Sequence, residues 1–292
     1  MNFLIAFIVG AGNLVGALIA PRDRRGARSW LALAIGVPSM VAAHWIPRDW
    51  PVFRTVAAFG LMAGYFRLIA IALRPHSPMV GRVLGVTLPI VEPRRVASVP
   101  RTVRIDLFVA GAFEVGVAVF LFACAKTLPH DAIATRTLVA GTSAYFVVDG
   151  TSRLLEAITR AIGVDIGPLH DDPILARTVG EFWNRRWNRP IHAWLNEFAF
   201  RPVAKRFGVV MGVLAAFGAS AVLHFVPICV AYDVKWAAVM AAFFLIHGVV
   251  VVIEAKLGVA RWPRALGHVW TLGIFSITAP LFVLPLLQSL GG

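Results

Sequence analysis

Eight runs of mostly apolar residues alternate with polar segments along this 292-residue chain. An α-helix needs about 20 residues to cross a bilayer, and tilt absorbs small differences in length. We expect membrane spans at about 1–20, 30–46, 52–73, 105–125, 137–158, 207–230, 236–255 and 266–287. The pattern predicts an all-α integral membrane protein, a polytopic helical bundle of about eight transmembrane helices.

The composition agrees with this class, because 59% of the residues are hydrophobic and only 15% are charged. Soluble domains carry roughly 25% charged residues. We find no internal repeat or flexible linker and therefore expect a single domain over residues 1–292, with a non-membrane segment at 161–206. The two cysteines, Cys124 and Cys229, lie in apolar runs and lack metal-ligand spacing.

Basic residues are distributed unevenly between the two sets of alternating loops. One set carries 22 of the 28 Lys and Arg residues and the other carries five, with Arg67 inside a span. This bias follows the positive-inside rule, so we expect the segment 161–206 in the cytoplasm and both termini outside it. The net charge of +13 then needs no nucleic-acid partner. The run 1–20 lacks the basic start of a signal peptide, which favours a retained first span.

Aromatic and basic residues are concentrated in the cytoplasmic segment, where the sequence EFWNRRWN precedes Pro190. Proline suits the first turn of a helix, since its missing N–H has no partner there anyway. After it, Ile191, Trp194, Leu195 and Phe198 recur at i, i+3, i+4 and i+7 and form one apolar face. We expect a short amphipathic helix in the cytoplasmic interface, with this face toward the bilayer.

A histidine, His224, lies deep in the span at 207–230, with Ser220 one turn before it on the same side. At 1.5 Å per residue, the imidazole is about 25 Å from the cytoplasmic end of its helix. Ionisable side chains at that depth are costly and usually face the bundle interior or a wet cavity. His224 is therefore a functional candidate, and the alternative is a packing or hydrogen-bonding role.

Other ionisable groups also fall at membrane depth. Arg67, Glu114, Asp149 and Glu156 lie in or beside predicted spans, and we expect them to pair with one another inside the bundle or with a polar acceptor in the cavity. His247 near the middle of a later span is expected to be structural.

The sequences FWNRRWN at 182–188 and SAVLH at 220–224, with the amphipathic helix between them, resemble the membrane-bound O-acyltransferase superfamily. The likeness is greatest to its wax synthase-like branch, which residues 173–183 and FLIHGVVVVIE at 244–254 also resemble. The resemblance rests on specific motifs over about 170–256. Over the first 160 residues it rests only on the arrangement of predicted membrane spans. The resemblance implies an acyl-CoA-dependent O-acyltransferase in which His224 is the catalytic histidine and Asn188 its partner. Wax synthases often have a small residue at the position of Asn184, so Asn184 is the alternative partner.

The implied reaction makes an ester from an acyl-CoA thioester and an alcohol. A neutral buried histidine suits the role of general base that activates the hydroxyl. An asparagine amide either donates a hydrogen bond to the oxyanion or orients the histidine. No covalent intermediate is required, and Cys229 is turned away from the helical face of His224.

Side chains beside the motif are candidates for binding the coenzyme, whose phosphates arrive from the cytoplasm. Arg185, Arg186 and Arg189 provide a positive surface, and Trp183 and Trp187 frame the entrance. The alternative for the arginines is to orient the protein and contact anionic lipid. We expect no metal, because the two acidic and histidine clusters, at 130–131 and 170–172, fall on opposite sides of the bilayer.

We therefore predict an enzyme of lipid metabolism that esterifies the hydroxyl of a lipophilic acceptor, with residues 1–160 on the acceptor side and His224 in the catalytic part at 207–292. A long-chain alcohol, a sterol and a terpenoid or polyketide-like metabolite are all open as acceptors. A catalytically inactive lipid-binding scaffold is the main alternative, and a transporter is less favoured because no repeat is found. The richness in arginine and alanine favours a bacterial inner membrane, and the sequence leaves the oligomeric state open.

Overall fold

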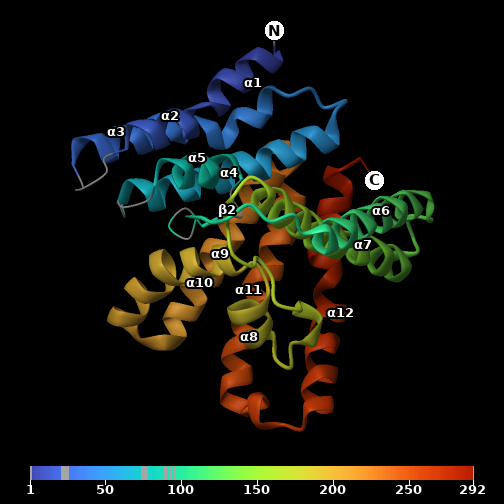
Figure 1. Cartoon of the computed structure of the whole chain (residues 1–292). Helices are drawn as coiled ribbons and strands as arrows, with labels where there is room; N and C mark the ends of the chain where they lie inside the picture. The colour runs from blue at the N-terminus through green and yellow to red at the C-terminus, as the bar shows by residue number, and fades with distance from the viewer. Residues whose placement is uncertain are drawn as a thin grey trace.

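The computed structural model describes residues 2–20, 26–73, 78–88, 91–92, 94 and 96–291, and helices dominate it (Figure 1). The N-terminal part contains α1 (Asn2–Gly10), α2 (Gly12–Ile19), α3 (Ala27–Gly36), the 3-10 helix η1 (Val37–Trp45), α4 (Pro51–Leu73) and α5 (Met79–Thr87). A helical hairpin follows, formed by α6 (Ile105–Thr127) and α7 (Ile133–Ala161). Two short antiparallel strands flank it, β1 (Ala97–Ser98) and β2 (Val164–Asp165), with Ala97 opposite Asp165.

The C-terminal part holds the motif and the histidine. It contains η2 (Pro173–Leu175), α8 (Val179–Glu181), the π-helix η3 (Phe182–Arg186), α9 (Arg189–Leu195), the π-helix η4 (Asn196–Phe200), α10 (Arg201–Ala231), α11 (Val234–Leu257), η5 (Val259–Arg261) and α12 (Arg264–Ser289). Figure 1 shows α8 beside the lower halves of α11 and α12, while the C terminus lies near their upper ends.

Five helical segments are long and apolar enough to cross a membrane: Pro51–Leu73, Ile105–Thr127, Arg189–Ala231, Val234–Leu257 and Arg264–Ser289. They match five of the predicted spans and confirm an all-α, multi-pass membrane protein. Within the described ranges the structure does not reach eight such helices, so the total of eight stays a prediction.

The other three predicted spans have different local structures. Residues 1–20 form the two short helices α1 and α2. Residues 30–46 form α3 and then η1, so one continuous α-helix there is a wrong prediction. Pro38 lacks the N–H that would extend the α-helical ladder to Ala34. Residues 137–158 lie in the 29-residue helix α7, which is less apolar than the five because it includes Asp149 and Arg153.

Gly208 reverses the chain between α9 and the end of α10. Its φ of +86° and ψ of 166° interrupt the helix, in a region that glycine adopts without a steric penalty. A Cβ at Gly212 would lie 2.7 Å from the Cβ of Ala204 and 2.9 Å from the ring of Phe200. Residues 189–207, which we call the arm, therefore fold back on the helix that carries His224 (gold and orange in Figure 1).

The predicted amphipathic helix lies in this arm. It begins at Arg189, with Pro190 in its first turn as expected, and continues into η4. Trp194 is buried and packs against Phe66 of α4, with ring centroids 4.5 Å apart. At Trp194 the apolar face thus contacts the protein, and its placement in the membrane interface stays a prediction.

Arg67 of α4 is paired with an acid outside the predicted spans. Its guanidinium lies 3.0 Å from the carboxylate of Glu92, and both side chains are almost fully buried. Glu92 also accepts from Arg94, which reaches Glu197 of the arm at 2.6 Å. This chain of ion pairs connects the N-terminal helices to the arm.

Glu114 of α6 and Asp149 of α7 share one arginine, Arg153, at 3.2 and 3.0 Å. The prediction that Arg67, Glu114, Asp149 and Glu156 pair among themselves is therefore wrong. Two carboxylates near each other repel in a low-dielectric interior, and a shared guanidinium removes that repulsion.

The contact between α6 and α7 depends on two glycines. A Cβ at Gly111 would lie 2.7 Å from the backbone oxygen of Gly150 and 3.0 Å from Leu154. Small residues at such crossings let membrane helices approach closely.

We predict that Gly111→Ala lowers the free energy of unfolding by about 1–3 kcal/mol, because the added methyl group forces α6 and α7 apart. The measurement is the melting temperature of the detergent-solubilised protein, which should fall. Gly116→Ala on the same helix is the control, since nothing lies within 4 Å of its added Cβ. It gains helix propensity without a clash and should be neutral or slightly stabilising. Equal melting temperatures of the two variants would contradict close packing at Gly111.

Candidate active site

The motif helix, formed by α8 and η3 at 179–186, starts with a side-chain cap. The Oγ1 of Thr178 accepts the backbone N–H of Glu181 at 2.7 Å. The pair is visible in the sequence as Thr followed three residues later by Glu, a known signature of a helix start. Eight residues are too few for a helix that is stable by itself, so contacts with other elements must hold it.

A buried carboxylate on α11 holds the first turn of the motif helix. Glu254 accepts the backbone N–H groups of Val179 at 2.7 Å and Gly180 at 2.8 Å. It also accepts the indole N–H of Trp270 on α12 at 2.8 Å. A negative charge at a helix N-terminus is favourable, because the unpaired N–H groups there carry partial positive charge. Glu254 thus joins the motif helix, α11 and α12.

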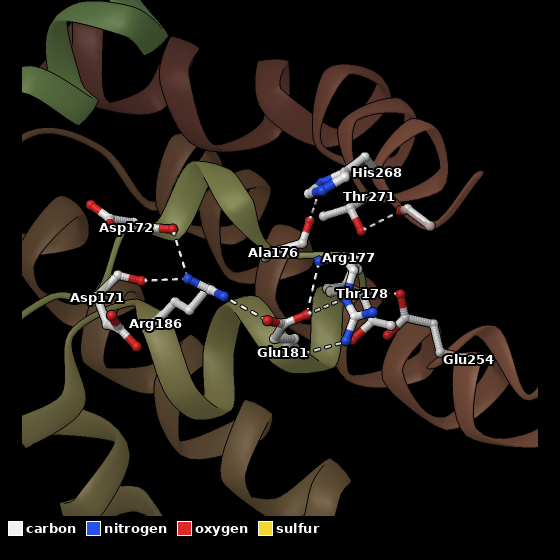
Figure 2. Close-up of polar contacts among 12 residues, drawn as sticks. Asp171, Asp172, Ala176, Arg177, Thr178, Glu181, Arg186, Glu254, His268 and Thr271 are labelled. Atoms are coloured by element: carbon white, nitrogen blue, oxygen red, sulfur yellow. Dashed lines mark hydrogen bonds and ion pairs between the residues drawn. The ribbon is translucent and has the colours of Figure 1, made fainter. Parts of the chain in front are cut away.

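Glu181 and two arginines connect the motif helix to the preceding loop (Figure 2). Glu181 accepts the backbone N–H of Arg177 at 2.9 Å and the Nε–H of Arg186 at 2.8 Å. Burial alone would raise the pKa of Glu181, but these hydrogen bonds and the two positive charges lower it below its usual value. Arg186 also donates to the backbone oxygens of Asp171 at 2.9 Å and Asp172 at 3.2 Å.

The start of α12 supports the same loop. The Nδ1 of His268 lies 3.0 Å from the backbone oxygen of Ala176. Gly267 approaches so closely that a Cβ would lie 2.7 Å from the backbone oxygen of Arg177. Figure 2 shows His268 above the loop and Glu254 near Thr178, at the start of the motif helix, so α12 and α11 together fix the loop and the helix.

Trp183 points from the motif helix into the bundle. Its Nε1–H donates to Nδ1 of His247 at 2.9 Å, and Nε2 of His247 lies 2.8 Å from Oγ1 of Thr278. Because the indole can only donate, Nδ1 of His247 must be the unprotonated nitrogen and Nε2 must carry the proton. His247 is fully buried with both nitrogens used, as a structural histidine requires.

His224 differs from His247 because one of its nitrogens has no hydrogen-bond partner in the described part of the chain. Its Nδ1 lies 2.8 Å from the backbone oxygen of Ser220. Since a carbonyl only accepts, Nδ1 carries the proton and Nε2 keeps its lone pair. Nε2 makes no hydrogen bond within the described residues. Aromatic rings from three helices surround the imidazole, Phe244 at 4.0 Å, Phe59 at 5.7 Å and Phe282 at 6.0 Å between centroids.

Asn188 is the N-cap of α9, in a left-handed conformation with φ of +42°. Its Oδ1 accepts the N–H of Ile191 at 3.4 Å, and its own backbone N–H donates to Nδ1 of His170 at 3.2 Å. The side-chain amide nitrogen has no hydrogen bond to any described residue. The structure records no contact between Asn188 and His224. Asn184 is exposed on the π-helical turn η3.

The residues predicted to bind the coenzyme fall into different environments. Arg185 is exposed and Arg189 half-buried, and neither guanidinium has an acidic partner among the described residues. Arg186 is held by Glu181, and Trp183 lies inside the bundle. Trp187 stacks on Phe182 at 5.5 Å and on Tyr145 of α7 at 6.1 Å, and contacts His170 at 4.7 Å.

Two features of the site were not predicted from the sequence, because no local pattern indicates them. One π-helical segment, η3, lies inside the motif and the other, η4, follows α9. Such turns are frequent at functional sites but are not predictable from periodicity. Glu254 and His268 lie 75 and 92 residues from the groups that they bind, so no local pattern indicates those contacts. In the described part of the chain no group of three or more His, Cys, Asp or Glu side chains is arranged to hold a metal ion.

Comparison with known proteins finds a family match over the part of the chain that holds these residues. The family model described as "Membrane bound O-acyl transferase family" matches residues 166–246, which include the motif helix, the arm and His224. This part of the chain is similar to the membrane bound O-acyl transferase family. The match ends before Glu254, so the residue that holds the motif helix lies outside the matched segment.

Several curated plant proteins are similar to this chain. It is 30% identical to "Probable long-chain-alcohol O-fatty-acyltransferase 7" of Arabidopsis thaliana, over 44% of this chain and 42% of that protein. It is 27% identical to "Long-chain-alcohol O-fatty-acyltransferase" of Simmondsia chinensis, over 64% of this chain and 56% of that protein. It is 29% identical to "Acyl-CoA--sterol O-acyltransferase 1" of Arabidopsis thaliana, over 48% and 45%.

These comparisons confirm the resemblance to the wax synthase-like branch of the family. The chain spans about half the length of the curated relatives that it matches. Because the named relatives are plant proteins, they give no support to a bacterial inner membrane.

We predict that Glu254→Gln destabilises the protein by about 1–3 kcal/mol, because the glutamine NH₂ would face backbone N–H groups that need an acceptor. The measurement is thermal unfolding of the purified protein in detergent. Glu156→Gln is the matched control, since that side chain accepts no hydrogen bond from a described residue. If the two variants have the same melting temperature, Glu254 does not hold the motif helix.

Proposed function

We propose that this protein transfers an acyl group from acyl-CoA to the hydroxyl of a lipophilic acceptor inside the membrane. The hydroxyl oxygen attacks the thioester carbonyl carbon, a C–O bond forms and the C–S bond breaks. The hydroxyl proton moves to Nε2 of His224 and then to the departing sulfur, so the products are an ester and free coenzyme A. No redox partner and no covalent enzyme intermediate are involved.

The observation that carries the proposal is the hydrogen bond from Nδ1 of His224 to the Ser220 oxygen, at 2.8 Å. It fixes the ring and directs the lone pair of Nε2 away from its own helix. A general base needs that free lone pair, and the surrounding aromatic rings disfavour the charged imidazolium before the acceptor arrives. His247, with both nitrogens occupied, is unsuited to the role.

The partner role of Asn188 is compatible with its role as a helix cap. The cap uses Oδ1 as an acceptor, whereas an oxyanion needs a donor, and the amide nitrogen is unused within the described residues. The same carboxamide is thus able to serve both roles at once. Asn184 is the alternative, and its exposure on η3 places fewer constraints on its position.

The cytoplasmic coenzyme would meet Arg185 and Arg189, whose guanidinium groups are not held by acids. Trp187 adds a stacked aromatic surface next to them. The rings of Phe59, Phe244 and Phe282 suit an apolar substrate chain. Since the named relatives act on long-chain alcohols and sterols, we propose an acceptor of that class.

We predict that His224→Ala lowers the rate of coenzyme A release by about 10²–10⁴-fold, the usual contribution of a general base. The assay gives the purified full chain a panel of acyl-CoA donors and long-chain alcohols or sterols and detects the free thiol and the ester. Binding of acyl-CoA and the melting temperature should remain near those of the unmodified protein. If the variant turns over normally, His224 is structural. If the unmodified protein binds donor and acceptor without turnover, the inactive scaffold is the better description.

A second pair of variants separates the two roles of Asn188. Aspartate caps helices as well as asparagine does and also tolerates the left-handed region, so Asn188→Asp should keep the fold. It removes the amide donor, and we expect the turnover number to fall about 10²–10³-fold with little change in melting temperature. Asn184→Asp makes the same chemical change on the exposed turn. A loss confined to Asn184→Asp would make Asn184 the partner, and a loss in neither would leave Asn188 as a cap only.

A further inference from the structure

The end of the bundle opposite the motif helix has a basic cavity. Its volume is about 420 Å³, and it is lined by His44, Trp45, Ile46, Pro47, Arg48 and Arg54. Three of these six side chains are arginine or histidine, and none is acidic. Volumes of this size are typical of small-ligand sites.

Arg54 is a buried cation with no counter-ion among the described residues. Only 4% of the residue is exposed. Its guanidinium donates to the backbone oxygens of Ile46 at 2.7 Å and Val230 at 2.9 Å, and lies 3.5 Å from Nδ1 of His44. No described carboxylate comes within ion-pair distance, and its Nε has no hydrogen-bond partner.

Arg67 on the same helix has the acidic partner that Arg54 lacks among the described residues. It is equally buried, and Glu92 lies 3.0 Å away. A buried guanidinium without an opposite charge is costly. Asp49, next to Arg48 in the chain, is exposed and forms no ion pair with a described residue. The charge of Arg54 is therefore left for a ligand to neutralise.

The first turn of α4 adds to the positive potential. Arg54 lies there, where the helix N-terminus carries partial positive charge. Trp45 lines the same cavity, and tryptophan is enriched at the level of lipid headgroups. Guanidinium groups suit phosphate oxygens, which accept paired N–H donors.

We infer that this cavity binds a phosphate group, carried by a lipid headgroup or free in solution, through Arg54, Arg48 and His44. The site is separate from the proposed coenzyme site. Arg54 bonds to Val230, just before α11 begins at Val234, whereas the motif helix is held by Glu254, 20 residues later. At 1.5 Å per residue these points are about 30 Å apart.

The test measures the melting temperature of the purified full chain in detergent. Short-chain phosphatidylglycerol is compared with phosphatidylcholine of equal chain length, and sodium phosphate with sodium chloride at equal ionic strength. At saturation, we expect phosphatidylglycerol to raise the melting temperature by about 5 °C and phosphatidylcholine to have no comparable effect. A rise with inorganic phosphate as well identifies the phosphate itself as the ligand, and a rise with phosphatidylglycerol alone identifies the lipid headgroup.

Variants locate the effect in the cavity. Arg48→Gln removes an exposed charge without a described partner, so it should fold and should need at least tenfold more ligand for half of the rise. Arg54→Gln should abolish the rise. Lys235→Gln is the matched control, because it removes an exposed charge in the first turn of α11, outside the cavity, and should respond like the unmodified protein. The inference is overturned if neither phosphate compound raises the melting temperature, if phosphatidylcholine acts equally, or if Arg48→Gln responds normally.

Discussion

The arrangement of the site depends on one buried carboxylate at the start of a short helix. The motif helix has only eight residues, and helices of that length do not persist without tertiary contacts. Glu254 accepts two of its first N–H groups and the Trp270 indole together. Because unsatisfied backbone donors are costly where water is scarce, these bonds position the helix on α11 and α12. The positions of Trp183, Trp187 and Asn188 follow from this attachment.

Aromatic packing connects the motif helix to His224. Trp183 lies against Phe244 with ring centroids 5.8 Å apart, and Phe244 stacks on His224 at 4.0 Å. The hydrogen bond from Trp183 to His247 prevents the indole from sliding along this surface. The motif helix and the candidate base therefore share one wall, formed by α11, although they belong to different parts of the chain.

Local sequence patterns were sufficient for several features and insufficient for others. The long apolar runs predicted five spans, and the spacing around Pro190 predicted the start of α9, because both depend on residues close in sequence. The family likeness located the motif, which the comparison confirmed over 166–246. The contacts of Glu254, the pairing of Arg67 with Glu92 and the reversal at Gly208 were not predicted. Each brings together groups far apart in sequence, or depends on a backbone angle that glycine permits but does not require. The 3-10 helix η1 was not predicted, because the length and hydrophobicity of a run do not reflect the helix-breaking effect of Pro38.

The fixed ring of His224 has a consequence for the order of events in the proposed reaction. Nδ1 keeps its proton on a backbone oxygen, so the imidazole has a single atom for both accepting and returning a proton. A proton taken from the acceptor cannot pass through the ring to another group, and it leaves only when the sulfur of the donor is ready to receive it. In the direct transfer that we propose, donor and acceptor would therefore have to occupy the site together, as a ternary complex.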